Sequence, residues 1–485
     1  MSALQASSLR ENPCGALLVM ARLTPELSVP VSNKLTSLEF RGMVAILISI
    51  ALATLDTAIA NTALPAIAAD LNASPAASVW IINAYQLAAV ATLLPFAALG
   101  GVIGHRKVYL GGLILFVVSS ALCTFAWSLP TLTIARVLQG LGASAIMSVN
   151  AALISSIFSR ERLGRGLGMN ALVVGTSFAA GPTIASLVLS VANWPWLFAI
   201  NLPIGIFALV FAWNSLPISK PGTLTFDPVT ALLNVLTFGA LIFALSQAAQ
   251  LGSWTSVLIA LGVFLVGFVL MLRREAGHPA PMFPLDLLKR PMFALSALTA
   301  FCSFATQGLA FVSLPFFFET VLGRDPVQTG FLMTPWSVVV AMIAPFAGRL
   351  SDRYAPGLLG GIGLAILCAG MVSLAFMSAS ASAWQICFSM IICGLGFGFF
   401  QAPNQKALMT SAPRERASGA SGTIATARLI GQATGAALVA FSFGVSGEHG
   451  PVLALSIGAG FAAVGSIASG LRLVTKNLPG STPGQ

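Results

Sequence analysis

The chain has 485 residues, of which 57% are hydrophobic and only 8% are charged. Soluble proteins carry about 25% charged residues, so this composition excludes a soluble protein and predicts an all-α integral membrane protein. The net charge of +10 raises nucleic-acid binding as an alternative, which the distribution of the charges argues against below.

Fourteen apolar stretches are long enough to cross a membrane, since about 20 helical residues span the hydrocarbon core. We predict helices over residues 42–69, 78–100, 108–127, 130–158, 164–192, 196–215, 228–249, 254–272, 291–320, 327–349, 357–378, 383–408, 416–444 and 450–473. Residues 1–41 and 474–485 form polar tails. Similar short basic turns follow the second and the tenth helix, which indicates two related halves.

These halves define the predicted domains. We expect one six-helix bundle over residues 42–216 and another over residues 291–473. Residues 217–290 would insert a helix pair and a cytoplasmic loop between them. Parallel six-helix repeats with a site between them are a transporter architecture.

Basic residues gather on one predicted side of the membrane. If the N-terminus is cytoplasmic, 21 of the 24 Lys and Arg residues lie in or next to cytoplasmic segments. This asymmetry follows the positive-inside rule and predicts that both termini are cytoplasmic, in the inner membrane of a bacterial-type cell. The positive charge then reflects topology and contact with the lipid bilayer, so we expect no nucleic-acid partner.

Asp56 lies in the first helix and is the only ionisable residue between Arg41 and Asp70. A carboxylate at membrane depth costs a few kcal/mol and usually marks a proton or cation site. Burial disfavours its charged form, so we expect Asp56 to face a central cavity and hold a proton until a cation arrives. The alternative is a structural hydrogen bond to a neighbouring helix.

Three more charged residues stand within or at the end of predicted helices. Arg136 and Arg428 are buried cations that need partners, and for each a functional role and a structural role remain open. Glu319 follows three phenylalanines at the outer end of the ninth helix. It either attracts a cation that stacks on the rings or is an ordinary interfacial acid.

Four motifs in order along the chain resemble the major facilitator superfamily, and within it the fourteen-helix drug:proton antiporters. They are Leu55-Asp56-x₄-Asn61-x-Ala63-Leu64-Pro65, Leu132-x₃-Arg136-Val137-x-Gln139-Gly140-x-Gly142-Ala143, Gly175-x₅-Gly181-Pro182 and Trp194-x-Trp196-x-Phe198-x-Ile200-Asn201-x-Pro203-Ile204-Gly205. Residues 400–404 and 425–432 resemble exporters of quaternary-ammonium and methyl-viologen cations. The resemblance implies proton relay by Asp56 with Arg136, and we assign a candidate substrate or coupling role to Asn61, Gln401, Asn404, Arg428 and Glu319.

The same resemblance assigns conformational roles to Gly181 and Pro182, and to Gly348, Asp352 and Arg353 after the tenth helix. The chain departs from the family pattern at Gly101, where an acidic residue of an intracellular latch usually stands. It also has Ala185-Ser186 where the fifth-helix motif normally ends Gly-Gly, and Pro195 where arginine usually separates the tryptophans. The latch then depends on the second-half copy at Asp352.

No lysine stands in a phosphate-binding loop, which needs Gly-x₄-Gly-Lys-Ser/Thr. Residue spacing predicts neither a metal site nor a cofactor. The sequence therefore favours a monomeric, non-enzymatic multidrug exporter that exchanges hydrophobic or cationic drugs for protons by alternating access. Export of an endogenous metabolite, such as an amino acid, sugar or siderophore, is the alternative, and a non-transporting membrane enzyme or sensor is disfavoured.

Overall fold

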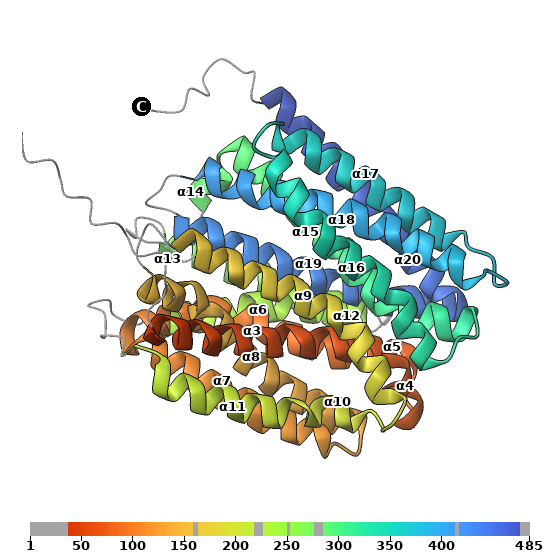
Figure 1. The fold of residues 1–485 in the computed structure, drawn as a ribbon, viewed down its shortest axis with the longest axis horizontal. Helices are drawn as coiled ribbons and strands as arrows, with labels where there is room; N and C mark the ends of the chain where they lie inside the picture. Colours follow the sequence, from red (N-terminus) through yellow and green to blue (C-terminus); the bar gives the residue numbers. More distant parts are fainter. Residues whose placement is uncertain are drawn as a thin grey trace, which may run out of the picture. The chain divides into compact units, whose positions relative to one another are not determined.

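The computed structural model describes residues 37–158, 163–217, 227–249, 253–275, 285–412 and 417–475, and these are almost entirely helical (Figure 1). The predicted tails lie outside this range except for residues 37–41 and 474–475. In the predicted insert, residues 218–226, 250–252 and 276–284 also lie outside it.

The first half of the described chain contains the helices expected from the sequence. They are α3 (Ser37–Thr62), α4 (Leu64–Asp70), α5 (Pro75–Ser78), α6 (Trp80–Ile103), α7 (His105–Thr124), α8 (Leu129–Ile157), α9 (Leu163–Leu189), α10 (Pro195–Ala199) and α11 (Asn201–Ser215). Two predicted helices are interrupted, at Ala63 and at Ile200. Pro65 and Pro203 lack the N–H group that a continuous helix needs there, which explains both interruptions.

The rest of the described chain is helical too. Its elements are α12 (Pro228–Ala249), α13 (Trp254–Glu275), α14 (Leu285–Leu288), α15 (Pro291–Phe316), the π-helix η1 (Phe317–Val321), α16 (Pro326–Leu350), α17 (Pro356–Ala375), α18 (Ala383–Ser411), α19 (Ala417–Ser446), the 3₁₀-helix η3 (Gly447–His449) and α20 (Gly450–Thr475).

Twelve stretches of the described residues are long and apolar enough to cross a membrane. The last of them, Thr423–Val474, contains both α19 and α20, and α12 contributes the shorter apolar stretch Pro228–Leu241. Each of the fourteen predicted helices therefore has a counterpart, and the protein is an all-α integral membrane protein.

At one end of the molecule, three helices begin with a residue whose side chain caps the helix N-terminus. Ser128 and Thr131 form a capping box on α8, Ser382 and Gln385 form another on α18, and Asp325 caps α16. These side chains satisfy backbone N–H groups that the first helical turn leaves without partners. We call this the outer end, because the charge distribution predicts that it faces outward, and the opposite end the inner end.

Helices pack mainly with others of the same predicted bundle. In the first, α8 packs against α6 and α7; in the second, α15 packs against α19 and α20, and α17 against α18 and α20. The inserted α12 packs on α13 and also contacts α6 and α19. The exact domain boundaries at residues 216 and 290 stay a prediction.

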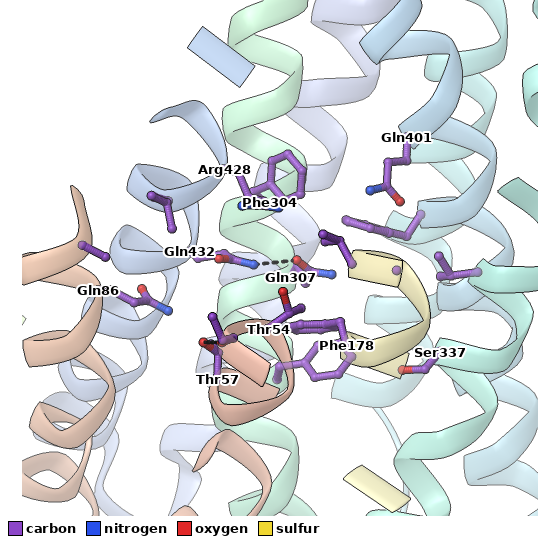
Figure 2. Close-up of a pocket in the computed structure, with 18 of the residues that line it drawn as sticks. Thr54, Thr57, Gln86, Phe178, Phe304, Gln307, Ser337, Gln401, Arg428 and Gln432 are labelled. Carbon is purple, nitrogen blue, oxygen red and sulfur yellow. Dashed lines mark hydrogen bonds between the residues drawn. The ribbon is translucent and has the colours of Figure 1, made fainter. Parts of the chain in front are cut away.

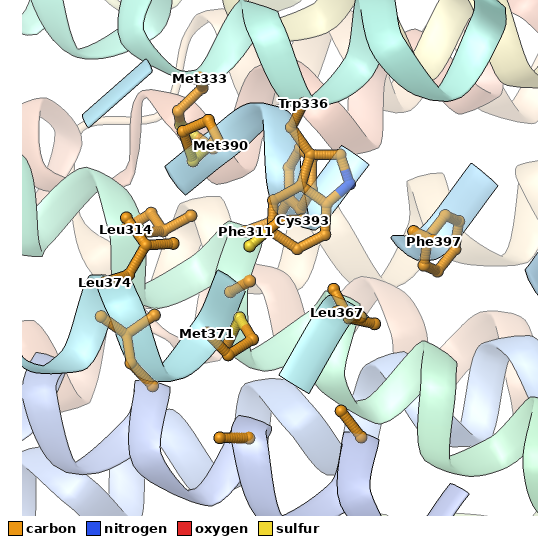
Figure 3. Close-up of a cluster of buried hydrophobic side chains, with 14 of the residues drawn as sticks. Phe311, Leu314, Met333, Trp336, Leu367, Met371, Leu374, Met390, Cys393 and Phe397 are labelled. Atoms are coloured by element: carbon orange, nitrogen blue, oxygen red, sulfur yellow. The ribbon is translucent and has the colours of Figure 1, made fainter. Parts of the chain in front are cut away.

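The second bundle has a dense apolar core where α15, α16, α17 and α18 meet (Figure 3). Phe311 and Trp336 are both 1% exposed, and their rings lie edge to face with centroids 5.3 Å apart. Met333, Met371 and Met390 are fully buried around them. This core fixes one wall of the site described below.

Helices α9 and α16 meet at the outer end and join the two predicted bundles. The hydroxyls of Thr183 and Thr334 are 2.7 Å apart, and Ser186 Oγ lies 3.5 Å from the carbonyl oxygen of Pro326. Gly330 packs directly on the Ser186 side chain and the Pro182 carbonyl, where a Cβ would overlap both. Ser186, one of the departures from the family pattern, is thus a contact residue of this outer seal.

Replacing Gly330 by alanine should weaken the outer seal. The added methyl group must displace Ser186 or the α9 backbone, and overpacking of this kind costs about 1–3 kcal/mol. We expect a lower thermal unfolding midpoint for the purified protein in detergent. Gly460→Ala on α20 is the matched control, since a Cβ there meets no atom within 4 Å; an equal effect of both variants would contradict the close contact.

Candidate functional site

Asp56 of α3 and Arg136 of α8 form a buried ion pair. Arg136 Nη1 lies 2.5 Å from Asp56 Oδ2, and the two side chains are 1% exposed or less. Arg136 also donates to the carbonyl oxygen of Ile81 at 3.2 Å. Two charges at this depth are tolerated only when they are paired and further hydrogen-bonded, so the pair ties α3, α6 and α8 together.

Two amide side chains complete the surroundings of the carboxylate. Gln139 of α8 and Asn201 of α11 donate to Asp56 Oδ1 at 2.9 and 2.7 Å. The Gln139 carbonyl accepts a bond from Arg136 at 2.6 Å, and its amide also reaches Ser120. The carboxylate therefore accepts three hydrogen bonds, from Arg136, Gln139 and Asn201.

Tyr85 of α6 covers the ion pair on one side. Its ring lies under the Arg136 guanidinium, 4.3 Å from the ring centroid, and its hydroxyl is 3.4 Å from the Ala53 carbonyl oxygen. Gly140 of α8 allows this approach, because a Cβ there would overlap the Tyr85 carbonyl. A cation on an aromatic face is attracted by the ring, so Arg136 holds Tyr85 in place.

The other side of Tyr85 borders a cavity between helices of the two predicted bundles (Figure 2). The cavity has about 840 Å³ of atom-free space when the part open to solvent is included. Its lining is Ala53, Thr54, Thr57, Tyr85, Gln86, Ala89, Met147, Val174, Gly175, Phe178, Phe304, Gln307, Phe311, Trp336, Ser337, Val340, Phe397, Gln401, Arg428, Leu429 and Gln432.

The expectation that Asp56 faces this cavity is wrong. Ala53, Thr54 and Thr57 line it and share one face of α3, whereas Asp56 is rotated toward α8 and is absent from the lining. Residues on one helix face are spaced three or four apart, and the sequence alone does not show which face meets the cavity. Tyr85, which lies against Arg136 and lines the cavity, connects the ion pair to it.

The predicted substrate residues divide into two groups. Gln401 and Arg428 line the cavity. Asn61, Glu319 and Asn404 do not: Asn404 accepts a bond from the buried Arg472 at 2.8 Å, and Asn61 and Glu319 each keep a buried oxygen without a partner in the described part of the chain. The sequence predicted substrate contact for Asn404, but its side chain bonds to Arg472 within the second bundle.

The residues of the predicted conformational motifs lie at the two ends. Gly181 of α9 packs on Ala58 of α3, and the Pro182 carbonyl belongs to the outer seal. At the inner end, Gly348 closes α16, and Asp352 and Arg353 are exposed. Asp352 pairs with Lys406 of α18 at 2.5 Å, so this ion pair lies within the second predicted bundle.

The sequence reasoning did not single out Gln139, Asn201 or Tyr85. Gln139 and Asn201 stand inside two of the quoted motifs, where an amide next to a buried charge was a usable signal. Tyr85, one of three tyrosines in the chain, lies outside all four motifs. The described residues contain no group of His, Cys, Asp and Glu that could hold a metal ion.

Comparisons with known proteins show the family and the fold. The sequence profile of the Major Facilitator Superfamily matches residues 46–436. A bacterial homologue of the human lysosomal transporter Spinster, solved in an inward-facing, unoccupied conformation, has a similar fold: the TM-score is 0.64 over 91% of this chain and 98% of that one, at 14% identity.

Three curated relatives match most of the chain. The uncharacterized transporter YebQ of Escherichia coli K12 is 49% identical over 90% of this chain and 95% of its own. The riboflavin transporter RibZ of Clostridioides difficile is 28% identical over 83% and 88%. The multidrug resistance protein Stp of Mycobacterium tuberculosis CDC 1551 is 31% identical over 79% and 72%.

Replacing Arg136 by methionine should destabilise the protein strongly. The change leaves the Asp56 carboxylate buried without its cation, and removing one partner of a buried pair costs about 3–5 kcal/mol. The double variant Arg136→Met with Asp56→Asn removes both charges and should recover much of that loss. Thermal or denaturant unfolding in detergent measures the stability of the single and the double variant. If the destabilising effects of the two substitutions were simply additive, the pairing would be contradicted.

Proposed function

Because the chain belongs to the major facilitator superfamily, we propose that it is a proton-coupled exporter of hydrophobic, aromatic compounds. The observation that supports this best is the position of the Asp56–Arg136 pair, which lies against Tyr85, a residue of the cavity lining. A group that binds one proton there sits one side chain away from a bound substrate.

Proton binding at Asp56 would change the cavity through its neighbours. A protonated Asp56 no longer attracts the Arg136 guanidinium, and Arg136 holds the Tyr85 ring by a cation–π contact. Since Tyr85 lines the cavity, movement of its ring alters the space for a substrate. By reciprocity, a substrate that displaces Tyr85 alters the affinity of Asp56 for its proton.

The transport cycle would be alternating access, with residues 42–216 rocking against residues 291–473. The outer seal between α9 and α16 would open to release substrate. The proton gradient is the proposed energy source, since one charge crossing 100 mV gains about 2.3 kcal/mol. We place the protein in the inner membrane of a bacterial-type cell, with both termini cytoplasmic, on the distribution of its basic residues.

Two candidate substrate classes follow from the relatives. Stp is named a multidrug resistance protein, which favours drug efflux. RibZ is named a riboflavin transporter, which favours an endogenous metabolite as the second candidate. The predicted preference for organic cations finds no support in the cavity, because its one charged lining residue is Arg428.

Asp56→Asn should abolish gradient-driven export while the protein still reaches the membrane, although loss of the anion paired with Arg136 lowers its stability. Asparagine keeps the shape of the side chain but neither binds the transported proton nor carries the charge paired with Arg136. The measurement is dye transport into everted vesicles under an imposed pH gradient, with protein content checked by immunoblot. Undiminished transport by Asp56→Asn would overturn the proposed role.

Asp227→Asn is the matched control at an exposed site. Arg274 donates to both Asp227 oxygens and, with Thr230, holds the pKa of Asp227 well below its usual range. The contribution of this pair to stability is present above the usual carboxyl pKa of about 4 and is lost only as the pH falls further. Between about pH 5 and 8 Asp227 stays ionised, so this variant should keep the pH profile of transport.

A further inference from the structure

The polar side chains of the cavity come from six helices and favour one sign of ligand charge. Arg428 of α19 is the charged residue of the lining, and the other lining residues are apolar or neutral. Among the described residues Arg428 makes no hydrogen bond or ion pair, whereas Asp56 is held by Arg136 away from the cavity. A half-buried guanidinium without an acid is a site for an anion.

Further donors at the cavity wall have no partner in the described chain. The Trp336 indole N–H and the Ser337 hydroxyl are buried, line the cavity and bond to no described group. Buried polar groups normally have partners, so these two are open positions for ligand oxygens. The buried side-chain carbonyl oxygen of Gln86, which also lines the cavity, has no hydrogen-bond partner in the described chain either.

A pair of glutamines adds a recognition edge beside Arg428 (Figure 2). Gln432 donates to the Gln307 carbonyl at 2.9 Å, as the dashed line shows. This bond uses one amide N–H and one carbonyl lone pair, and leaves the Gln307 amide group and the Gln432 carbonyl for a ligand. The two glutamines can therefore bind a ligand that carries a hydrogen-bond acceptor next to a hydrogen-bond donor.

The remaining walls are aromatic. Phe178 and Phe311 lie with ring centroids 4.9 Å apart, and Phe304 and Phe397 meet edge to face at 5.9 Å. These rings come from α9, α15 and α18, so both predicted bundles contribute. Aromatic rings around a cavity favour a flat, conjugated solute that can stack on them.

We propose that the cavity selects planar aromatic solutes bearing a carboxylate or a similarly acidic group, with Arg428 as the residue that binds the acid, and that it discriminates against organic cations. This inference names a substrate class for the proposed exporter, and its physiological meaning rests on that proposed function. The binding preference itself follows from the lining.

Two dyes with the same three-ring xanthene core test the proposal. Fluorescein carries a carboxylate and is anionic near neutral pH, whereas rhodamine 6G is an esterified cation. Binding to the purified full-length protein in detergent is followed by fluorescence anisotropy without any pH gradient. We expect fluorescein to bind at least roughly tenfold more tightly, since a charge-assisted hydrogen bond is worth that factor or more.

Variants of Arg428 then locate the preference. Arg428→Gln should weaken fluorescein binding roughly tenfold or more and leave or improve rhodamine 6G binding, and Arg428→Lys should lose less. Trp336→Phe keeps the ring but removes the indole donor, so it should weaken fluorescein selectively and provides a second variant if Arg428→Gln does not fold. Arg274→Gln makes the same chemical change outside the cavity and should change neither affinity.

Tighter binding of rhodamine 6G, or fluorescein binding that is absent or insensitive to Arg428, overturns the proposal. Its failure is distinct from failure of the proposed function. Arg428-dependent fluorescein binding without gradient-driven transport supports the cavity preference and overturns proton-coupled export. Gradient-driven transport of rhodamine 6G without fluorescein binding supports proton-coupled export and overturns the cavity preference.

Discussion

The buried ion pair between Asp56 and Arg136 is the constraint on which the first half of the molecule depends. Removing two charges from water costs several kcal/mol for each ion, and this is offset only while the two stay together with Gln139 and Asn201 around them. Helices α3, α8 and α11 are therefore held in one arrangement as long as Asp56 is charged. A single proton at this position changes the balance of forces between three helices.

The same constraint decides the electrostatics of the cavity. Because Arg136 and two amides bind the Asp56 carboxylate, this acid is not available to a solute on the other side of Tyr85. The opposite wall supplies Arg428, and the cavity is left with an unmatched positive charge. The buried ion pair and the cavity are thus neighbouring but separate places, and Tyr85 is the side chain that belongs to both.

Much of this arrangement was predictable from the sequence. Apolar length located every long helix, and the resemblance to the major facilitator superfamily implied that Asp56 acts together with Arg136. The direction of Asp56 was not predictable, because a helix that is apolar on all sides has no polar stripe to show which face meets a cavity. Asn404 was misplaced for a similar reason: its partner Arg472 lies 68 residues away in sequence, and no local pattern links them.

The two ends of the molecule are held by forces of different strength. At the outer end, Gly330 and Ser186 pack without a gap, and Thr183 bonds to Thr334. At the inner end, the acid expected at position 101 is missing, and Asp352 is used by Lys406 in an exposed pair. Exposed ion pairs contribute only about 0–1 kcal/mol. Close packing of α9 on α16 holds the outer end, and α3 packs on α9 at Ala58 and Gly181, so the proposed coupling to Asp56 has a direct route to that contact.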